Sequence, residues 1–141
     1  MLPALPFGGN GLPKKHLINM KSIQLYLRSR ISSFGFAFNG LWSFFKNEPN
    51  ARIHFAFTLA VLAAAFYFNV SATEAMALLI VTAIVWVTEI FNTAIEHTMN
   101  FISTEKNEHI KLIKDLAACG VLLAAIAALI TGLIVFLPKI L

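Results

Sequence analysis

The stretch LAACGVLLAAIAALITGLIVFL, residues 116–137, decides the fold class of this chain. It contains no charged residue, and a helix needs about 20 mostly apolar residues to cross a bilayer. Leu and Ala dominate the stretch, which is too long for a single strand. The sequence therefore predicts a membrane-spanning helix here.

The composition of the whole chain agrees with a membrane protein. Of its 141 residues, 58% are hydrophobic and only 13% are charged, whereas a soluble domain carries about 25% charged residues. The same figures exclude a disordered chain. The single cysteine, Cys119, excludes an intramolecular disulfide and a cysteine-cluster metal site.

The charged residues lie in separate islands along the chain. No Lys or Arg occurs between Arg52 and Lys106, and after Lys114 only Lys139 remains. Uncharged stretches between charged islands are typical of spans separated by loops. We therefore predict an all-α integral membrane protein, with helices that include the spans at about 51–68, 74–102 and 109–137.

The basic residues also predict the orientation in the membrane. Of the eleven Lys and Arg, seven lie in the first 52 residues and three in the loop at 103–115. The positive-inside rule places both segments on the cytoplasmic side of the cytoplasmic membrane. The net charge of +4 then indicates attraction to the lipid bilayer or to phosphates, and no nucleic acid partner is expected.

Before the first span, the sequence predicts a surface helix at about 31–47. Five large apolar residues recur there at helical spacing: Phe34, Phe38, Leu41, Trp42 and Phe45. Such a stripe favours an amphipathic helix in the bilayer interface, although a core-facing helix of a soluble bundle would show it too. Residues 1–30, with several Pro and Gly, are expected to form a flexible basic tail.

Four polar residues on the second span need an explanation. They are Glu89, Asn92, Glu96 and Asn100, and at helical spacing they fall within roughly 80° of one another. An unpaired polar group in hydrocarbon costs several kcal/mol. The face is either a functional site or a polar contact surface between helices. A third reading is that the helix has already left the membrane at Glu96, so that Glu96 and Asn100 lie in water.

Chemistry favours a divalent cation at this face. The span that carries these carboxylates contains no Lys or Arg to pair with them, and Mg²⁺ prefers oxygen ligands, often one or two carboxylates together with phosphate oxygens. Glu48 precedes the first span at the same level, and Lys111 and Lys114 suit phosphate as point charges. A solvated helix start would also explain these two lysines.

Two segments resemble a known family. Residues 89–103 read EIFNTAIEHTMNFIS and residues 110–126 read IKLIKDLAACGVLLAAI. The pattern E-x-x-N-[ST]-A-I-E, followed by a loop and K-D before the last span, resembles the small prokaryotic diacylglycerol and undecaprenol kinases. The resemblance covers about residues 31–141 and includes KNEPNARIHF at 46–55.

The resemblance implies a lipid kinase that transfers the γ-phosphate of MgATP to a membrane lipid alcohol. The acceptor would be diacylglycerol, giving phosphatidic acid, or undecaprenol, giving undecaprenyl phosphate, and the sequence leaves both open. The family implies a homotrimer with shared active sites. A non-catalytic membrane scaffold or a cation-conducting oligomer is the alternative from another class.

The resemblance also assigns roles to residues. Glu89 would be the general base, and Glu48 and Glu96 would hold Mg²⁺. Asn92 and Asn100 would support the site, although the family usually has an aspartate at the position of Asn100. The implied ATP-binding residues are Arg30, Glu48, Glu96, Glu105, Lys106, Asn107, Lys114 and Asp115.

Overall fold

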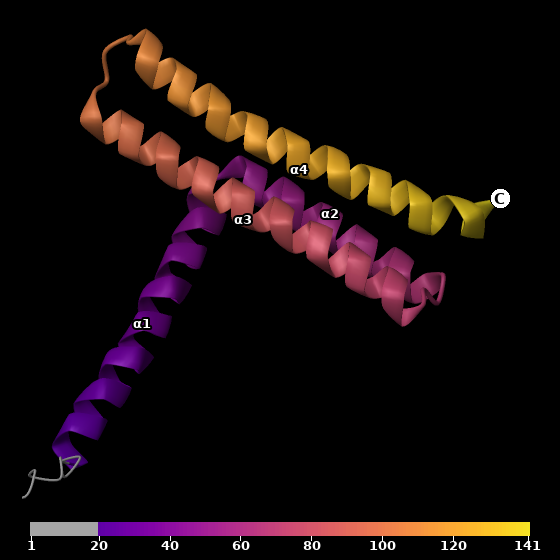
Figure 1. Cartoon of the computed structure of the whole chain (residues 1–141), viewed down its shortest axis with the longest axis horizontal. Coiled ribbons are helices and arrows are strands. Elements are labelled where there is room, and N and C mark those ends of the chain that lie inside the picture. Colours follow the sequence, from indigo (N-terminus) through magenta and orange to yellow (C-terminus); the bar gives the residue numbers. More distant parts are fainter. Residues whose placement is uncertain (1–19) are drawn as a thin grey trace, which may run out of the picture. The chain divides into compact units, whose positions relative to one another are not determined.

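The protein is all-helical in the part that the structure describes. The computed structural model describes residues 20–141 and contains four helices (Figure 1). They are α1 (Met20–Asn47), α2 (Pro49–Tyr67), α3 (Ala72–Ile102) and α4 (Glu108–Ile140). Helices α2, α3 and α4 are each long and apolar enough to cross a membrane, which confirms the predicted fold class.

The boundaries of these three helices lie within three residues of the predicted spans. The N-terminal helix differs more, because α1 begins at Met20, whereas a flexible tail was predicted through residue 30. No Pro or Gly lies between Pro13 and Gly35, so nothing in that stretch interrupts a helix. Residues 1–19 of the predicted tail lie outside the described part of the chain.

Local sequence explains where the spanning helices begin. Pro49 occupies the first helical position of α2, where its missing N–H costs nothing. A capping box starts α3: the backbone N–H of Glu74 donates to the Ser71 hydroxyl, and the Glu74 carboxylate accepts from the Ser71 N–H. Asn69, with φ 49°, supplies the left-handed residue of the tight turn before α3.

The chain divides into two compact units, Met1–Asn39 and Gly40–Leu141. In the first unit, the Arg30 guanidinium lies 4.7 Å from the centroid of the Tyr26 ring, a cation–π geometry. Ser32 and Ser33 both donate their hydroxyls to the Ser29 carbonyl. These contacts are local to α1.

In the second unit, the last turns of α1 pack through aromatic side chains. Phe44 is buried, and its ring lies 6.2 Å from that of Trp86, while Phe45 lies 5.3 Å from Trp86 and 5.6 Å from Phe55. The predicted apolar stripe included Trp42 and omitted Phe44. In the structure Trp42 is exposed and Phe44 is the packing residue.

Helices α3 and α4 form an antiparallel hairpin whose register is fixed at both ends. Near the connecting loop, Lys114 Nζ donates to Asn100 Oδ1 at 2.8 Å. At the far end, Lys139 Nζ lies 3.0 Å from Glu74 Oε1. This register places Glu89 level with residues 124–125 of α4.

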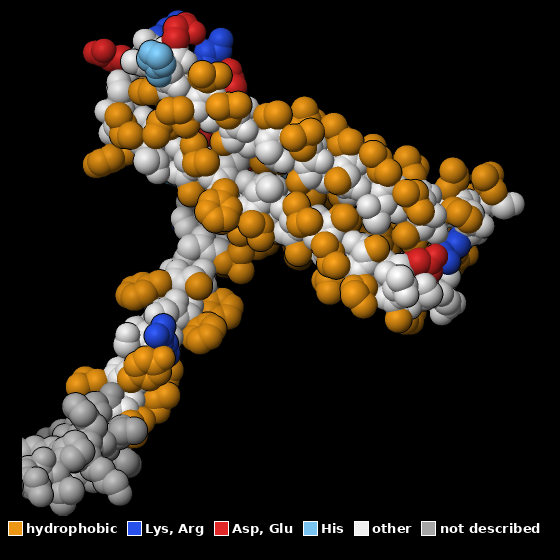
Figure 2. Space-filling model, in the orientation of Figure 1, with side chains coloured by type: hydrophobic (Ala, Val, Ile, Leu, Met, Phe, Trp, Pro, Cys, Tyr) orange, Lys and Arg blue, Asp and Glu red, His pale blue; other side chains and the backbone are white. Residues whose placement is uncertain are grey.

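The surface of the hairpin separates charged ends from an apolar middle. Figure 2 shows charged side chains gathered at the loop between α3 and α4 and again near the C-terminus, with hydrophobic side chains between them. The exposed side chains along this stretch include Leu79, Leu122, Leu129 and Ile134. A surface of this kind suits contact with lipid rather than water.

One hydrogen bond joins α2 to α3 within the apolar region. Trp86 Nε1 donates to Thr58 Oγ1 at 3.0 Å, and the Thr58 hydroxyl donates to the His54 carbonyl at 2.8 Å. Polar contacts between membrane helices contribute about 0.6 kcal/mol on average.

We predict that Thr58→Val destabilises the folded protein by about 1 kcal/mol, because the Trp86 N–H loses its acceptor. Unfolding in mixed micelles, followed by far-UV circular dichroism, measures this change. Thr131→Val is the matched control, since the Thr131 hydroxyl donates only to the Ala127 carbonyl of its own helix. Equal losses in the two variants would contradict a specific role for the interhelical bond.

Candidate active site

Glu89 is the most deeply buried charged residue that the structure describes. Its side chain is 2% exposed, on the face of α3 that lies against α2. Its Oε2 lies 3.9 Å from Nε2 of His54, which α2 contributes. An acidic side chain withdrawn from water in an apolar helix is a candidate functional group.

Sequence reasoning missed His54 as the neighbour of Glu89. The signal was present, because His54 and Thr58 are the polar interruptions of an otherwise apolar first span. Their spacing of one helical turn puts them on one face of α2. Which residue of α3 they would meet depended on how α2 packs against α3, which the sequence does not specify.

Asn92, one turn beyond Glu89, and Glu96, two turns beyond it, form a pair on the same helix. Asn92 is 7% exposed, and its Nδ2 donates to Glu96 Oε1 at 3.1 Å. This bond turns the amide so that Oδ1 points away from Glu96. Asn92 Oδ1 is buried and has no hydrogen-bond partner among the described residues. A buried carbonyl oxygen without a donor is uncommon in folded proteins and suits a site for an electropositive ligand.

Glu48 lies at the junction of α1 and α2 and contacts α3. Its carboxylate is at the N-cap position of α2 but makes no capping bond with its side chain. Glu48 Oε1 instead lies 3.2 Å from His97 Nε2. His97 follows Glu96 directly in the sequence, but the structure pairs its side chain with Glu48.

The start of α4 contributes one side chain to the polar face of α3. Lys114 binds Asn100 through the 2.8 Å bond described above. Asn100 is a neutral partner, so the positive charge of Lys114 is not cancelled by this contact. Lys114 therefore remains able to attract an anion.

The loop before α4 caps the N-terminus of that helix. Asn107 is the N-cap of α4, and its Oδ1 accepts from the backbone N–H groups of His109 and Ile110 at 2.8 and 3.3 Å. Glu105, Lys106 and Asp115 are exposed. Within residues 20–141, no hydrogen bond or ion pair joins these three to the polar face of α3. Arg30 belongs to the first compact unit, Met1–Asn39. The predicted ATP-binding roles of these four residues therefore stay predictions.

The polar face can be tested for its fit to a magnesium ion. Among the described residues, no group of three or more His, Cys, Asp and Glu side chains is placed to hold a metal. Mg²⁺ does not require such a cage, because it is usually held by one or two carboxylates together with substrate phosphates and water. Glu96 and the free Oδ1 of Asn92 are oxygen ligands of the right kind, so the residues present fit the ion.

A model of the prokaryotic diacylglycerol kinase family matches residues 35–136. The chain belongs to this family. Its members are lipid kinases of membranes, and with three apolar helices this protein is a multi-pass membrane protein of that class.

Two relatives of this kinase carry specific names. One is the undecaprenol kinase of Bacillus subtilis, which is 36% identical over 107 residues, or 76% of this chain and 87% of the relative. The other is the diacylglycerol kinase of Synechocystis, which is 36% identical over 110 residues. That alignment covers 77% of this chain and 63% of the relative's length. The two relatives are equally identical to this chain, but they are named for different lipid acceptors.

Proposed function

We propose that this kinase transfers the γ-phosphate of ATP, with Mg²⁺ bound, to the hydroxyl of a membrane lipid alcohol. The observation that carries the proposal is the burial of Glu89 in a membrane helix, beside a histidine, with Asn92 one turn and Glu96 two turns further along the same helix. A carboxylate in that position is available as a base for a substrate within the apolar layer. Family membership supplies the reaction class.

In the proposed step, Glu89 accepts the proton of the lipid hydroxyl. The lipid oxygen attacks the γ-phosphorus, the bond from that phosphorus to the β–γ bridging oxygen breaks, and ADP leaves with the electron pair. The products are a lipid phosphate, ADP and a protonated Glu89. Phosphoryl transfer needs positioning and charge neutralisation more than covalent help from the protein.

The remaining polar residues would position the nucleotide. Bound Mg²⁺ would neutralise charge on the ATP phosphates, and Glu96 and Glu48 would hold it, with Asn92 Oδ1 as a further oxygen. Lys114 would contact a phosphate, while Asn100 keeps its side chain in place. Arg30, Glu105, Lys106, Asn107 and Asp115 are the other proposed ATP contacts.

We further propose that the site faces the cytoplasm and that the protein is a homotrimer in the cytoplasmic membrane. The basic residues near the site support the orientation through the positive-inside rule. ATP is available on that side only, so the boundary between cytoplasm and bilayer is where a soluble donor and a lipid acceptor can meet.

The direct test is phosphate transfer from γ-labelled ATP in detergent micelles. Purified protein is given diacylglycerol or undecaprenol, and the labelled lipid is quantified. We expect Mg²⁺-dependent labelling of at least one acceptor, and the higher kcat/KM identifies the preferred one. Labelling of neither would contradict the proposed function and would favour a scaffold or a cation-conducting oligomer.

His54 is predicted to position Glu89 rather than to act on substrate. His54→Ala should lower kcat about ten-fold through loss of orientation, with the KM for ATP unchanged, because the nucleotide contacts lie elsewhere. His54→Gln, which keeps a hydrogen-bonding side chain, should recover part of the rate. His109→Ala is the control, since His109 is exposed on α4. An unchanged kcat in His54→Ala would contradict this role.

A further inference from the structure

The proposed transfer leaves a proton on Glu89, and this proton has to leave before the next turnover. The Glu89 side chain is only 2% exposed, so its carboxyl group has almost no contact with water. Along α3 it lies about 20 Å from the end of the helix at Ile102, at 1.5 Å per residue. Another group of the protein is therefore needed to take the proton from this carboxyl group.

His54 is the one ionisable side chain that an ion pair or hydrogen bond joins to Glu89 within residues 20–141. Its Nε2 lies 3.9 Å from Glu89 Oε2. The third helix, α4, offers no charged alternative at this depth, because residues 116–137 contain no charged residue. An imidazole is also the side chain that gains and loses a proton most readily near neutral pH.

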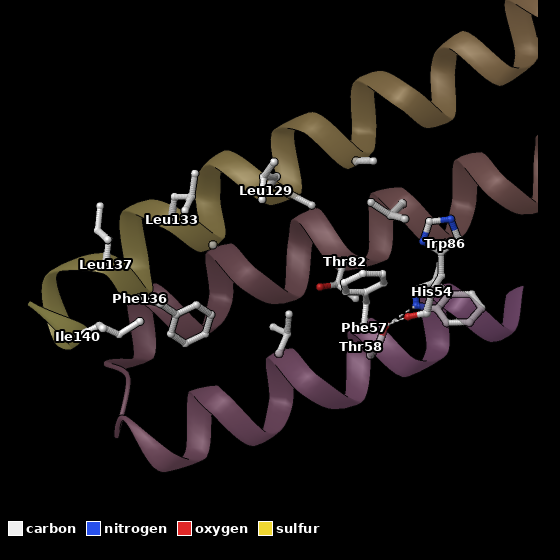
Figure 3. Close-up of a pocket in the computed structure, with 15 residues that line it drawn as sticks. His54, Phe57, Thr58, Thr82, Trp86, Leu129, Leu133, Phe136, Leu137 and Ile140 are labelled. Atoms are coloured by element: carbon white, nitrogen blue, oxygen red, sulfur yellow. Dashed lines mark hydrogen bonds between the residues drawn. The ribbon is translucent and has the colours of Figure 1, made fainter. Parts of the chain in front are cut away.

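Two hydrogen bonds hold His54 at the depth of Glu89. The Thr58 hydroxyl donates to the His54 carbonyl, and Trp86 Nε1 donates to the same hydroxyl. Trp86 lies one turn before Glu89 on α3, so both pairs of residues join the same stretches of α2 and α3. Figure 3 shows His54, Thr58 and Trp86 together at one end of a cavity. The contact between His54 and Glu89 is thus a supported part of the interface.

His54 is closer to water than Glu89 is. Its side chain is 21% exposed, against 2% for Glu89. Along α2 it lies only about 8 Å from Pro49, the first residue of the helix, at 1.5 Å per residue. A proton on this imidazole therefore has a shorter path to water than a proton on the Glu89 carboxyl group.

We propose that His54 takes the proton from Glu89 after each transfer and releases it to water. The inference rests on the proposed function, in which Glu89 is the base, and adds how that base is restored. The O–H bond of protonated Glu89 breaks, an N–H bond forms at His54 Nε2, and the carboxylate returns. The imidazolium then gives a proton to water. Histidine and carboxylate side chains serve as proton relays in other membrane proteins.

The separation of 3.9 Å exceeds a direct hydrogen bond. The proton crosses when a side-chain rotation shortens the distance or when one water molecule bridges the two groups. This step is separate from the positioning of Glu89, because positioning acts on the transfer itself and the relay acts only after it. The first turnover and the later turnovers therefore report on different roles of the same side chain.

His54→Gln separates the two roles, because glutamine keeps a hydrogen-bonding side chain but does not carry a proton near neutral pH. Rapid-quench measurements follow labelled lipid per site, with γ-labelled ATP in excess and diacylglycerol or undecaprenol as acceptor. The first turnover should stay within about two-fold of the unmodified protein, while the steady-state rate falls about five-fold. The variant should therefore show a burst of one lipid phosphate per site.

His109→Gln is the matched control, since His109 is an exposed histidine on α4. Its ratio of first-turnover rate to steady-state rate should equal that of the unmodified protein. If His54→Gln slows the first and the later turnovers by the same factor, or slows neither, His54 does not carry the proton. Its role is then limited to positioning Glu89.

Chemical rescue provides a second test with a different variant. His54 lines a cavity of about 490 Å³, so His54→Ala leaves room for a small ring. Added imidazole should raise the steady-state rate of this variant by about three-fold or more, because it carries a proton. Pyrazole has nearly the same shape but is a far weaker base, and it should change the rate by less than about 1.5-fold. Rescue by neither compound, or equally by both, would overturn the relay.

Failure of the relay is distinguishable from failure of the proposed function. If the unmodified protein labels neither diacylglycerol nor undecaprenol, the proposed function itself fails. If it labels either lipid and needs Glu89, the proposed function holds. The burst in His54→Gln and the rescue of His54→Ala then decide on His54 alone.

Discussion

Glu89→Gln should reduce kcat for lipid phosphorylation by about 10³-fold, within the range that a general base contributes. The amide has nearly the same shape and fits the buried position beside His54, so folding should be retained. It cannot accept the proton of the lipid hydroxyl. Labelled phosphate transfer under saturating ATP and lipid measures the loss.

Two further measurements separate this result from misfolding. ATP binding and the mass of the assembly should match those of the unmodified protein, because only the base has been removed. Glu108→Gln is the control, since Glu108 is an exposed residue in the first turn of α4, and its kcat should stay within about two-fold of normal. A Glu89→Gln protein with normal turnover would exclude Glu89 as the base, whereas disturbed assembly would favour a scaffold role.

Glu96→Gln should raise the Mg²⁺ concentration for half-maximal activity by about ten-fold or more, because a metal ligand loses its negative charge. The amide oxygen of the substituted side chain can still accept the hydrogen bond that Asn92 Nδ2 donates to Glu96, so the local structure is preserved. Activity is titrated against free Mg²⁺ at constant ATP. Removal of Mg²⁺ with a chelator should abolish transfer in the unmodified protein.

The same titration tests the other proposed ligand. Glu48→Gln should shift the Mg²⁺ dependence in the same direction, while Glu108→Gln should leave it unchanged. If neither Glu48→Gln nor Glu96→Gln alters the Mg²⁺ dependence, these carboxylates do not hold the ion. The contact of Glu48 with His97 would then be purely structural.

Much of the fold could be predicted because the bilayer restricts the choices. An uncharged run such as 116–137 must be a helix, since every backbone polar group in hydrocarbon needs a partner within the segment. The start of α1 was predicted too late, because the tail inferred from the Pro and Gly up to Pro13 was extended over a segment that contains neither. Phe44 was omitted since the stripe was chosen by periodicity alone.

The site was predicted in part. Helical spacing placed Glu89, Asn92 and Glu96 on one face, because that geometry is local to a single helix. The neighbours of this face come from other helices, and spacing along one helix says nothing about them. His54 beside Glu89, His97 beside Glu48 and Lys114 beside Asn100 therefore emerged only from the packing.

The sequence by itself determined that this chain is helical, lies in a membrane and carries acidic groups on its middle span, because hydropathy and helical periodicity are properties of single segments. The tertiary structure decided which groups face one another, how the α3–α4 register sets the depth of Glu89, and that His54 is its ionisable neighbour. These depend on the packing of three helices, in which interdigitating side chains, and not their order along the chain, fix the distances.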